Sequence, residues 1–258
     1  MLPFVSQCQE WLWENKGALS YLVDQRHMTP DSIIESGVGY FPSRAPFSGD
    51  WMKADDVAQM RGRIVVPIYS EFGSLVGMAS RATDPNKKGW WNTRFPKASH
   101  LYGFNVARKS IFEHNKAYVF EGYFDRIIMA QYGLQNSVAV MSSSLAIRRV
   151  GMLARYCEKL CLCFDTDEND SGFLGVLKSL ADMYSVGIGS AHSNWELTMV
   201  KLPKGEDPDE FTIKNGLDAF LSLERSIPEE KLKLAGRAHD ELKWKNKKKK
   251  NEEHPDGK

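Results

Sequence analysis

The stretch Ala117-Tyr-Val-Phe-Glu-Gly-Tyr-Phe-Asp125 joins an apolar, strand-like run to an acidic turn. A second stretch, Leu160-Cys-Leu-Cys-Phe-Asp-Thr-Asp167, repeats this arrangement further along the chain. When a strand ends in a carboxylate and a helix follows, the carboxylate lies at the carboxyl edge of a parallel sheet, where open α/β folds bind their ligands. Two such strands side by side would gather acidic oxygens, which repel one another unless a hard cation such as Mg²⁺ lies among them. The sequence therefore predicts a Mg²⁺-dependent site for phosphoryl chemistry.

Acidic residues after strands also have an ordinary structural role, because they stabilise the positive end of the following helix. Two acidic groups at successive strand ends of one sheet favour the metal site over that role. A third acidic group, Gly205-Glu-Asp-Pro-Asp-Glu210, also follows a strand-like run. Its proline suits the first turn of a helix. Asp207 and Asp209 therefore either begin a helix or hold a second metal ion, and both interpretations stay open.

The pattern of apolar residues divides the chain into two parts. From residue 117 it predicts alternating elements, with strands at 117–121, about 137–141, 160–165, about 186–190 and 197–202, and helices near 124–133, 145–157, 172–184 and 208–223. Alternation of this kind is typical of a parallel, Rossmann-like sheet. The earlier part predicts a helix over 3–24 that Gly17 interrupts, a short helix after Thr29, a strand pair over 63–69 and 75–81, and a short helix over 101–111.

Charge is distributed unevenly along a chain whose net charge is only +1 over 258 residues. Between Met60 and Lys109, nine lysines and arginines are opposed by only Glu71 and Asp84. A basic surface beside an acidic metal site suits a nucleic-acid polyanion. Isolated arginines are usually solvated surface charges, but a guanidinium can also bind two phosphate oxygens at once. Template or triphosphate contact is thus the functional interpretation of Arg61 and Arg63, and the same two interpretations apply to Lys97.

The four cysteines form no Cys-x-x-Cys pair, so no structural zinc site is expected and we interpret them as reduced core thiols. The sequence contains no signal peptide and no apolar run long enough to span a membrane, which predicts a cytoplasmic protein.

Taken together, the motifs resemble the catalytic core of DnaG-type bacterial and phage primases, whose metal site is a toprim domain. The resemblance runs with gaps over residues 4–223. The first, second and third toprim motifs are similar to Glu121-Gly-Tyr-Phe-Asp125, Asp165-Thr-Asp167 and Gly205-Glu-Asp-Pro-Asp209. Toprim motifs alone would also suit topoisomerases, some nucleases and recombination-mediator proteins. Arg61-Gly-Arg63, Lys97 and Leu101-Tyr-Gly-Phe104 are much more specific to primases.

The resemblance implies template-directed synthesis of short RNA primers on single-stranded DNA during replication, by metal-dependent nucleotidyl transfer. It implies two or more Mg²⁺ or Mn²⁺ ions, bound by Glu121, Asp165, Asp167, Asp207 and Asp209. Asp125 would support this site, and Lys97 would act with it in catalysis. Template or incoming nucleotide would be held by Arg61, Arg63, Arg81, Asn92 and Lys97. One ion would lower the pKa of the primer 3′-hydroxyl, and a second would neutralise the leaving pyrophosphate.

The expected architecture is α/β, with a basic α+β N-terminal subdomain over 1–115 and a Rossmann-like toprim domain over 116–223. A charged helix and a lysine-rich tail are expected over 224–258. Primases of this type usually begin with a zinc-binding domain, whereas residue 4 already resembles the region after it, which suggests a compact phage-type or split primase. Expected partners are single-stranded DNA, ribonucleoside triphosphates, and a replicative helicase or a separate zinc-domain protein in a primosome. A phage-encoded protein would act in the host cytoplasm.

Two other functions fit parts of the same sequence. A toprim-type nuclease or strand-cleaving enzyme would share Glu121, Asp165 and Asp167. A non-catalytic accessory protein that binds single-stranded DNA would use the basic region between Met60 and Lys109 and the lysine-rich end of the chain.

Overall fold

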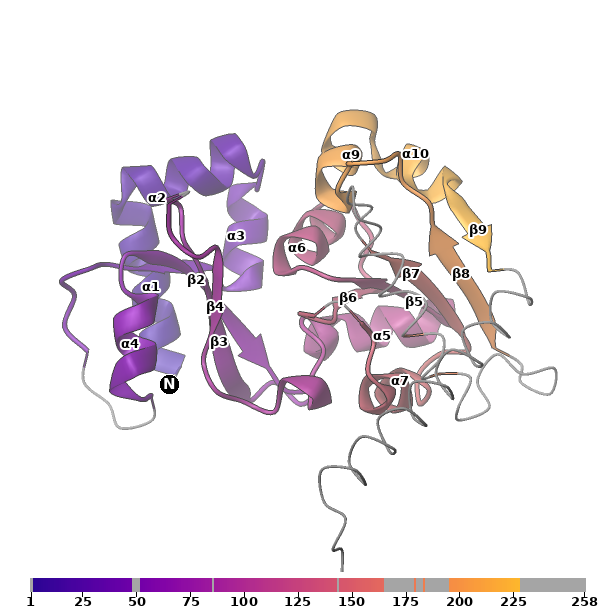
Figure 1. Cartoon of the computed structure of the whole chain (residues 1–258), viewed down its shortest axis with the longest axis horizontal. Coiled ribbons are helices and arrows are strands. Elements are labelled where there is room, and N and C mark those ends of the chain that lie inside the picture. The colour runs from indigo at the N-terminus through magenta and orange to yellow at the C-terminus, as the bar shows by residue number, and fades with distance from the viewer. Residues whose placement is uncertain are drawn as a thin grey trace, which may run out of the picture.

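Two β-sheets organise the chain in the computed structural model, which describes residues 2–47, 52–84, 86–142, 144–164, 179, 183 and 195–227. The first sheet has the strand order β1-β2-β3-β4, and the second has the order β6-β5-β7-β8-β9. Figure 1 shows the first sheet with helices α1 to α4 on the left and the second sheet on the right. This confirms the expected α/β class, with an N-terminal α+β part followed by a mostly parallel, Rossmann-like sheet.

The N-terminal helices are α1 (Leu2–Glu14), α2 (Lys16–Ser20), a π-helical turn η1 (Tyr21–Gln25) and α3 (Pro30–Ser36). The long helix expected here is interrupted at Asn15 and not at Gly17. The Asn15 side-chain oxygen accepts a hydrogen bond of 2.9 Å from the Ala18 amide, which caps the start of α2. Helix α3 begins as expected, with Thr29 as its cap and proline at the first position.

The first sheet is antiparallel throughout and is built from β1 (Gly39–Phe41), β2 (Arg63–Tyr69), β3 (Leu75–Arg81) and β4 (Trp90–Asn92). Strand β2 is buried along almost its whole length, in keeping with its apolar sequence. Helix α4 (Ala54–Met60) precedes β2 and was not expected from the sequence. A short 3₁₀ turn η2 (Lys97–Ser99) and helix α5 (Phe104–His114) then lead to the second sheet.

In the second sheet, β5 (Lys116–Phe120), β6 (Ser137–Ala139), β7 (Lys159–Cys163) and β8 (Glu196–Val200) are parallel, while β9 (Glu224–Ser226) is antiparallel to β8. The connecting helices are α6 (Tyr123–Gln131), α7 (Ile147–Leu153), α9 (Pro208–Asn215) and α10 (Leu217–Ser222). The single helix expected over 208–223 is thus two helices, which meet at Gly216. The helix expected over 172–184 and the strand over 186–190 lie almost wholly outside the described residues.

Alternate residues of β5 pack into different cores, as expected for a sheet that is covered on both faces. Ala117 and Val119 join an apolar cluster with residues of α5 and α7. Tyr118 and Phe120 join a second cluster, to which α6 and α10 contribute. This second cluster continues into the N-terminal helices and into β2 and β3. This second cluster is therefore the apolar core that the two sheets have in common.

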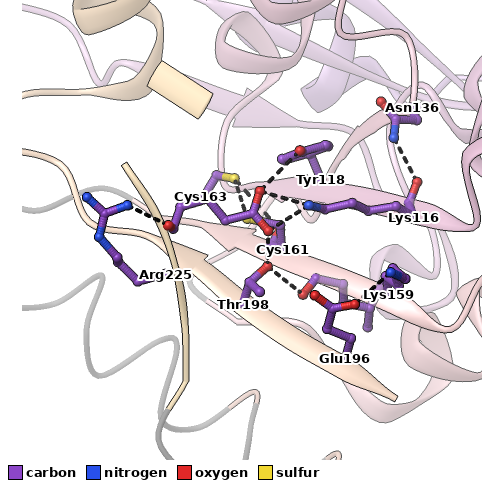
Figure 2. A network of polar contacts seen from close by, with 11 residues as sticks. Lys116, Tyr118, Asn136, Lys159, Cys161, Cys163, Glu196, Thr198 and Arg225 are labelled. Atoms are coloured by element: carbon purple, nitrogen blue, oxygen red, sulfur yellow. Dashed lines mark hydrogen bonds and ion pairs between the residues drawn. The ribbon is translucent and has the colours of Figure 1, made fainter. Parts of the chain in front are cut away.

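Hydrogen bonds to the Glu224 carboxylate attach strand β9 to the rest of the sheet. Figure 2 labels three of the donors, Lys116, Tyr118 and Thr198. Lys116 of β5 donates to both carboxylate oxygens at 2.6 and 2.8 Å, and Tyr118 donates at 3.2 Å. Thr198 of β8 donates at 2.5 Å. Among the described strands β9 pairs with β8 alone, and these side-chain bonds connect it to β5 at the centre of the sheet. The sheet therefore extends to Ser226, three residues beyond the expected domain boundary at 223.

The charged helix and tail expected after Ile227 lie outside the described residues. All four cysteines are described, and all are buried as free thiols. In the described part of the chain, no helix has the length and apolar character that crossing a membrane requires.

Candidate functional site

Glu121 directly follows β5, at the carboxyl edge of the parallel strands. In the sheet register Phe120 lies beside Cys163 of β7 and beside Ala139 of β6, so the carboxyl ends of these three strands meet there. The Glu121 carbonyl accepts a hydrogen bond of 2.9 Å from the Met141 amide, and the residue is half-buried. Asp165 and Asp167 lie outside the described residues, although the strand that leads to them ends at this edge.

Asp125 holds the turn between β5 and α6. Its side chain accepts a hydrogen bond of 3.0 Å from the Gly122 amide, which caps the N-terminus of α6. A Cβ atom at Gly122 would lie 2.4 Å from the Asp125 carboxylate, so any other residue there would push this carboxylate away from its bond to the Gly122 amide. Asp125 therefore positions the backbone next to Glu121.

The third acidic group lies at the start of α9. Asp207 is the exposed residue that precedes the helix, whereas Asp209 is buried in its first turn. An Asp209 carboxylate oxygen lies 3.7 Å from an Arg26 guanidinium nitrogen, and the Glu210 amide donates to Asp209 at 2.8 Å. Burial raises the pKa of the Asp209 carboxyl above its usual value, and the Arg26 charge opposes that rise.

Arg26 connects the N-terminal helices to this acidic group. Its guanidinium lies over the rings of Tyr21 and Phe124, at 5.8 and 5.5 Å from their centroids. It also donates a hydrogen bond of 3.3 Å to the Tyr21 hydroxyl, which accepts a further bond of 3.4 Å from Arg81. A hollow of about 620 Å³ lies here, and its lining includes Arg26, Arg81, Lys87 and Glu210.

The structure separates the two arginines of the Arg61-Gly-Arg63 motif. Arg63 is buried and donates to the carbonyls of Lys88 and Gly89, beside Arg81. Burial lowers the pKa of Arg63, and the neighbouring Arg81 charge adds to the effect. Arg61 instead donates to the carbonyls of Ser43 and Ala45, and it lies over the Phe41 ring. Arg63 and Arg81 thus form one basic group at one end of the paired strands β2 and β3, while Arg61 lies apart from them at the end of α4.

Asn92 and Lys97 lie where the two sheets meet. The Asn92 side-chain oxygen accepts a hydrogen bond from the Tyr123 hydroxyl at the start of α6. Lys97 is half-buried in the η2 turn. Burial lowers the pKa of its ammonium group, and the nearby Arg149 charge lowers it further. Asn92 is therefore in direct contact with the motif that carries Glu121, and Lys97 lies beside a second buried cation.

Three residues with central places at this junction were missed as site residues by sequence reasoning. They are Arg26, Tyr123 and the buried Arg149. Tyr123 stands inside the quoted Glu121–Asp125 motif, which was an available signal. Arg149 follows Arg148 on α7, and only the fold shows that the second of these two arginines is buried while the first is exposed.

Gln131 at the end of α6 and Tyr102 of the Leu101–Phe104 motif have structural contacts. The Gln131 side chain accepts from the Thr29 amide and the Ser32 hydroxyl, and it donates to the His27 carbonyl, which joins α6 to the start of α3. Tyr102 exchanges backbone hydrogen bonds with Ala139 of β6. These contacts place the primase-type motifs at the junction between the two sheets.

Known proteins resemble this chain in sequence. A Toprim-like family model matches residues 118–212. The DNA primase of Clostridium acetobutylicum is 31% identical over 169 residues, which is 64% of this chain and 27% of that protein. The DNA primase of Thermotoga maritima is 31% identical over 243 residues, which is 84% of this chain and 41% of that protein. The chain thus spans less than half the length of these curated relatives.

Solved structures share the fold. A DNA primase domain from Pseudomonas aeruginosa superposes with a TM-score of 0.74 at 23% identity, over 87% of this chain and 79% of that one. A DnaG primase catalytic domain bound to single-stranded DNA superposes with a TM-score of 0.73 at 22% identity, over 89% of this chain and 81% of that one. At these identities the likeness concerns the fold.

The Toprim-like match implies binding of divalent metal ions. Among residues 2–164 and 195–227 as far as they are described, no three acidic, histidine or cysteine side chains form a metal-binding cluster. The candidate ligands in this part are nevertheless of the right type, because half-buried Glu121 and exposed Asp207 both carry carboxylates, which hard divalent cations prefer. The donor chemistry therefore fits a divalent ion at the carboxyl edge of the sheet.

Sequence and fold lead to the same group of proteins. The sequence match to DNA primases extends across both sheets, and the fold match covers most of the chain. The chain belongs to the family of DnaG-type primases, and the part of them that it matches is the catalytic core, an RNA polymerase domain with a Toprim-like region.

Proposed function

We propose that the chain synthesises short RNA primers on a single-stranded DNA template, by metal-dependent transfer of ribonucleotides. The observation that carries the proposal is the joining of an acidic sheet edge to a basic sheet by specific contacts. Arg26 contacts Asp209, and Tyr123, two residues after Glu121, donates to Asn92. A polymerase that uses triphosphates needs both features at one place, because carboxylates hold the cations and basic groups hold the phosphates.

The relatives support this reaction over others that use the same metal site. Two relatives that are 31% identical are DNA primases, and the longer of these matches includes the basic sheet as well as the Toprim-like region. One solved relative was captured with single-stranded DNA. We therefore propose single-stranded DNA as the template. A replicative helicase, a separate zinc-domain protein and a phage origin stay predictions.

Each candidate residue has a proposed role. Glu121, Asp165, Asp167, Asp207 and Asp209 would hold Mg²⁺ or Mn²⁺. When bound, these ions would lower the pKa of the attacking 3′-hydroxyl and neutralise the pyrophosphate that leaves. Asp125 keeps the backbone at Gly122 in place beside Glu121. Arg26 compensates the charge of buried Asp209.

The basic residues would orient the nucleic acid and the triphosphate. Arg81 and Lys97 carry charges near the junction and are proposed to contact the triphosphate. One guanidinium nitrogen of Arg63 already donates to the carbonyls of Lys88 and Gly89. Its remaining donors, and those of Arg61, are proposed to bind template phosphates. The Asn92 amide group, fixed by Tyr123, is proposed to contact the incoming nucleotide or the template.

The test combines the protein with a single-stranded template, labelled ribonucleotides and Mg²⁺ or Mn²⁺. It compares the wild type with Asp165→Ala and Lys97→Ala, and Glu196→Gln and Lys204→Ala serve as controls at exposed positions. We expect template-dependent oligoribonucleotides from the wild type and both controls. Asp165→Ala should make none. Lys97→Ala should raise KM for the nucleotide.

Other outcomes would contradict the proposal in distinct ways. Shortened template that depends on Asp165 would indicate a nuclease. Template binding without any product, unchanged by Asp165→Ala, would indicate an accessory DNA-binding protein. Normal priming by Lys97→Ala would show that Lys97 does not contact the nucleotide.

A further inference from the structure

Arg149 is a buried cation at the junction between the two sheets. It lies on α7 with only 2% of its surface exposed, and burial lowers the pKa of its guanidinium to about 10. A buried charge is costly unless its donors are bonded, so such a residue is retained where its hydrogen bonds organise the surrounding backbone.

The guanidinium bonds to two segments that are distant in sequence. On one side it donates to the Lys97 carbonyl at 2.8 Å and to the His100 carbonyl at 2.9 Å. On the other side it donates to the Ser142 hydroxyl at 2.9 Å and to the Ser144 carbonyl at 3.3 Å. The first segment is the η2 turn of the basic N-terminal part. The second follows β6 at the carboxyl edge of the Toprim-like sheet.

The second segment is bonded in turn to the acidic edge. The amide of Met141, which immediately precedes Ser142, donates to the Glu121 carbonyl at 2.9 Å. Glu121 is therefore linked to Lys97 by three hydrogen bonds. They join Glu121 to Met141, the neighbouring residue Ser142 to Arg149, and Arg149 to Lys97.

We propose that Arg149 is a positioning residue, which holds the Lys97 turn at a set place relative to the Glu121 edge so that Lys97 meets the triphosphate bound there. This inference rests on the proposed function, in which Glu121 binds the metal and Lys97 contacts the triphosphate, because it explains how these two residues are held at a set distance. Arginine suits the task because its planar fork offers five donors, whereas lysine offers a single ammonium group and cannot reach four acceptors on two segments.

The charges around Lys97 support an anionic ligand at this place. The charge that acts on Lys97 is that of Arg149. Nearby in the same turn, the Arg148 guanidinium donates to the Ser99 hydroxyl at 3.4 Å. Burial lowers the pKa of His100, and Arg149 lowers it further. His100 is therefore neutral at neutral pH, and an anionic phosphate would relieve the repulsion between Lys97 and Arg149.

The test uses Arg149→Gln, with Arg149→Lys as the conservative variant. Arg126→Lys is the matched control, because Arg126 is also a buried arginine but contacts the Ser137 carbonyl and not the Lys97 turn. Two of the measurements do not require the protein to make primers. Amide hydrogen exchange should accelerate at residues 97–101 and 142–145 in Arg149→Gln, with β5 unchanged. Competitive acetylation of lysines across pH should show the midpoint of Lys97 moving to higher pH, with exposed Lys204 unchanged.

The kinetic readout separates positioning from loss of stability. In Arg149→Gln, KM for the ribonucleotide should rise and kcat/KM should fall by about 10- to 100-fold, as expected for a misplaced contact group. Arg149→Lys should recover part of the loss.

The proposal is overturned if the Lys97 midpoint does not move, if hydrogen exchange rises evenly along the chain, or if Arg126→Lys has the same effects. If the wild type makes no primers, the proposed function fails, whereas exchange and acetylation still decide whether Arg149 places Lys97. If Arg149→Gln does not fold, the same readouts on Arg149→Lys decide.

Discussion

Replacing Glu224 with alanine should weaken the second sheet at its last strand. The Glu224 carboxylate accepts two bonds from Lys116 and one each from Tyr118 and Thr198. Hydrogen bonds to a charged group contribute about 1.5–3 kcal/mol each when measured singly, and bonds to one acceptor are not additive. The Lys116 side chain is 22% exposed, so in the Glu224→Ala variant water can replace part of the hydrogen bonding that its ammonium group loses. We therefore expect Glu224→Ala to lower the free energy of unfolding by about 3 kcal/mol, which is at the lower end of the cost of breaking a buried ion pair.

The assay is reversible chemical unfolding, with thermal unfolding beside it. A loss of about 3 kcal/mol should lower Tm by roughly 6–12 °C in a chain of this size. The control is Glu196→Gln, which removes the exposed Lys159–Glu196 pair of the same sheet, drawn in Figure 2. Surface pairs contribute about 0–1 kcal/mol, so this variant should unfold almost as the wild type does. Equal losses in the two variants would refute the view that Glu224 fastens β9.

Acid adds a second check on Glu224. Burial alone would raise the pKa of this carboxyl, but the bonds from Lys116 and Thr198 bring it below its usual value of 4.5. A carboxylate whose pKa is lower in the folded state contributes stability above the unfolded value, and that contribution is lost as pH falls through the folded value. The stability difference between wild type and Glu224→Gln should therefore be full at neutral pH and shrink below pH 4.5. A difference that is independent of pH would contradict the ion pair.

Two further changes test the junction between the sheets. Gly103→Ala should cost about 2–4 kcal/mol in chemical unfolding, because Gly103 has φ +78° and a Cβ there would lie 2.3 Å from the Arg126 side chain. Gly73→Ala, at φ +86° with no atom within 4 Å, should cost only about 1 kcal/mol, and equal costs would exclude the clash. Arg26→Met should destabilise by about 2 kcal/mol, and a double-mutant cycle with Asp209→Asn should show coupling of about 1–2 kcal/mol. Additive effects in the cycle would show that the two charges do not interact.

The strongly apolar elements were predictable from the sequence, because burial on both faces of a sheet leaves a clear pattern. Strands β5 and β7 and the hairpin of β2 and β3 stand close to where the pattern placed them. Helix α4 was missed although Val57 and Met60 have helical spacing and acidic residues fill its first turn. Several glycines and prolines precede α4, at residues 37, 39, 42, 46 and 49; such residues are typical of irregular stretches and obscured this signal.

Other features depend on contacts that no local pattern records. Strand β9 has a polar sequence, and its place in the sheet comes from the distant partners of Glu224. Nothing in the sequence around Arg63 distinguishes it from an exposed arginine. In the fold it is buried, and its guanidinium donates to the Gly89 carbonyl. Glu121, in contrast, lies where the sequence pattern placed it, directly after buried strand β5, because the position of a residue that follows a strand is set by the sheet. The metal-binding roles of the acidic motifs stay predictions.

The pairing of Tyr102 with Ala139 has a consequence for any attempt to divide the molecule. Strand β6 is the outer strand of the second sheet, and an uncovered outer strand offers its backbone groups to any passing chain. Here Tyr102, from the segment that joins the two sheets, occupies that position and accepts and donates the Ala139 backbone bonds. A fragment cut at residue 115 would lose this cover. It would expose the backbone groups of Ala139, so we expect the isolated Toprim-like part to self-associate through this edge more readily than the whole chain does.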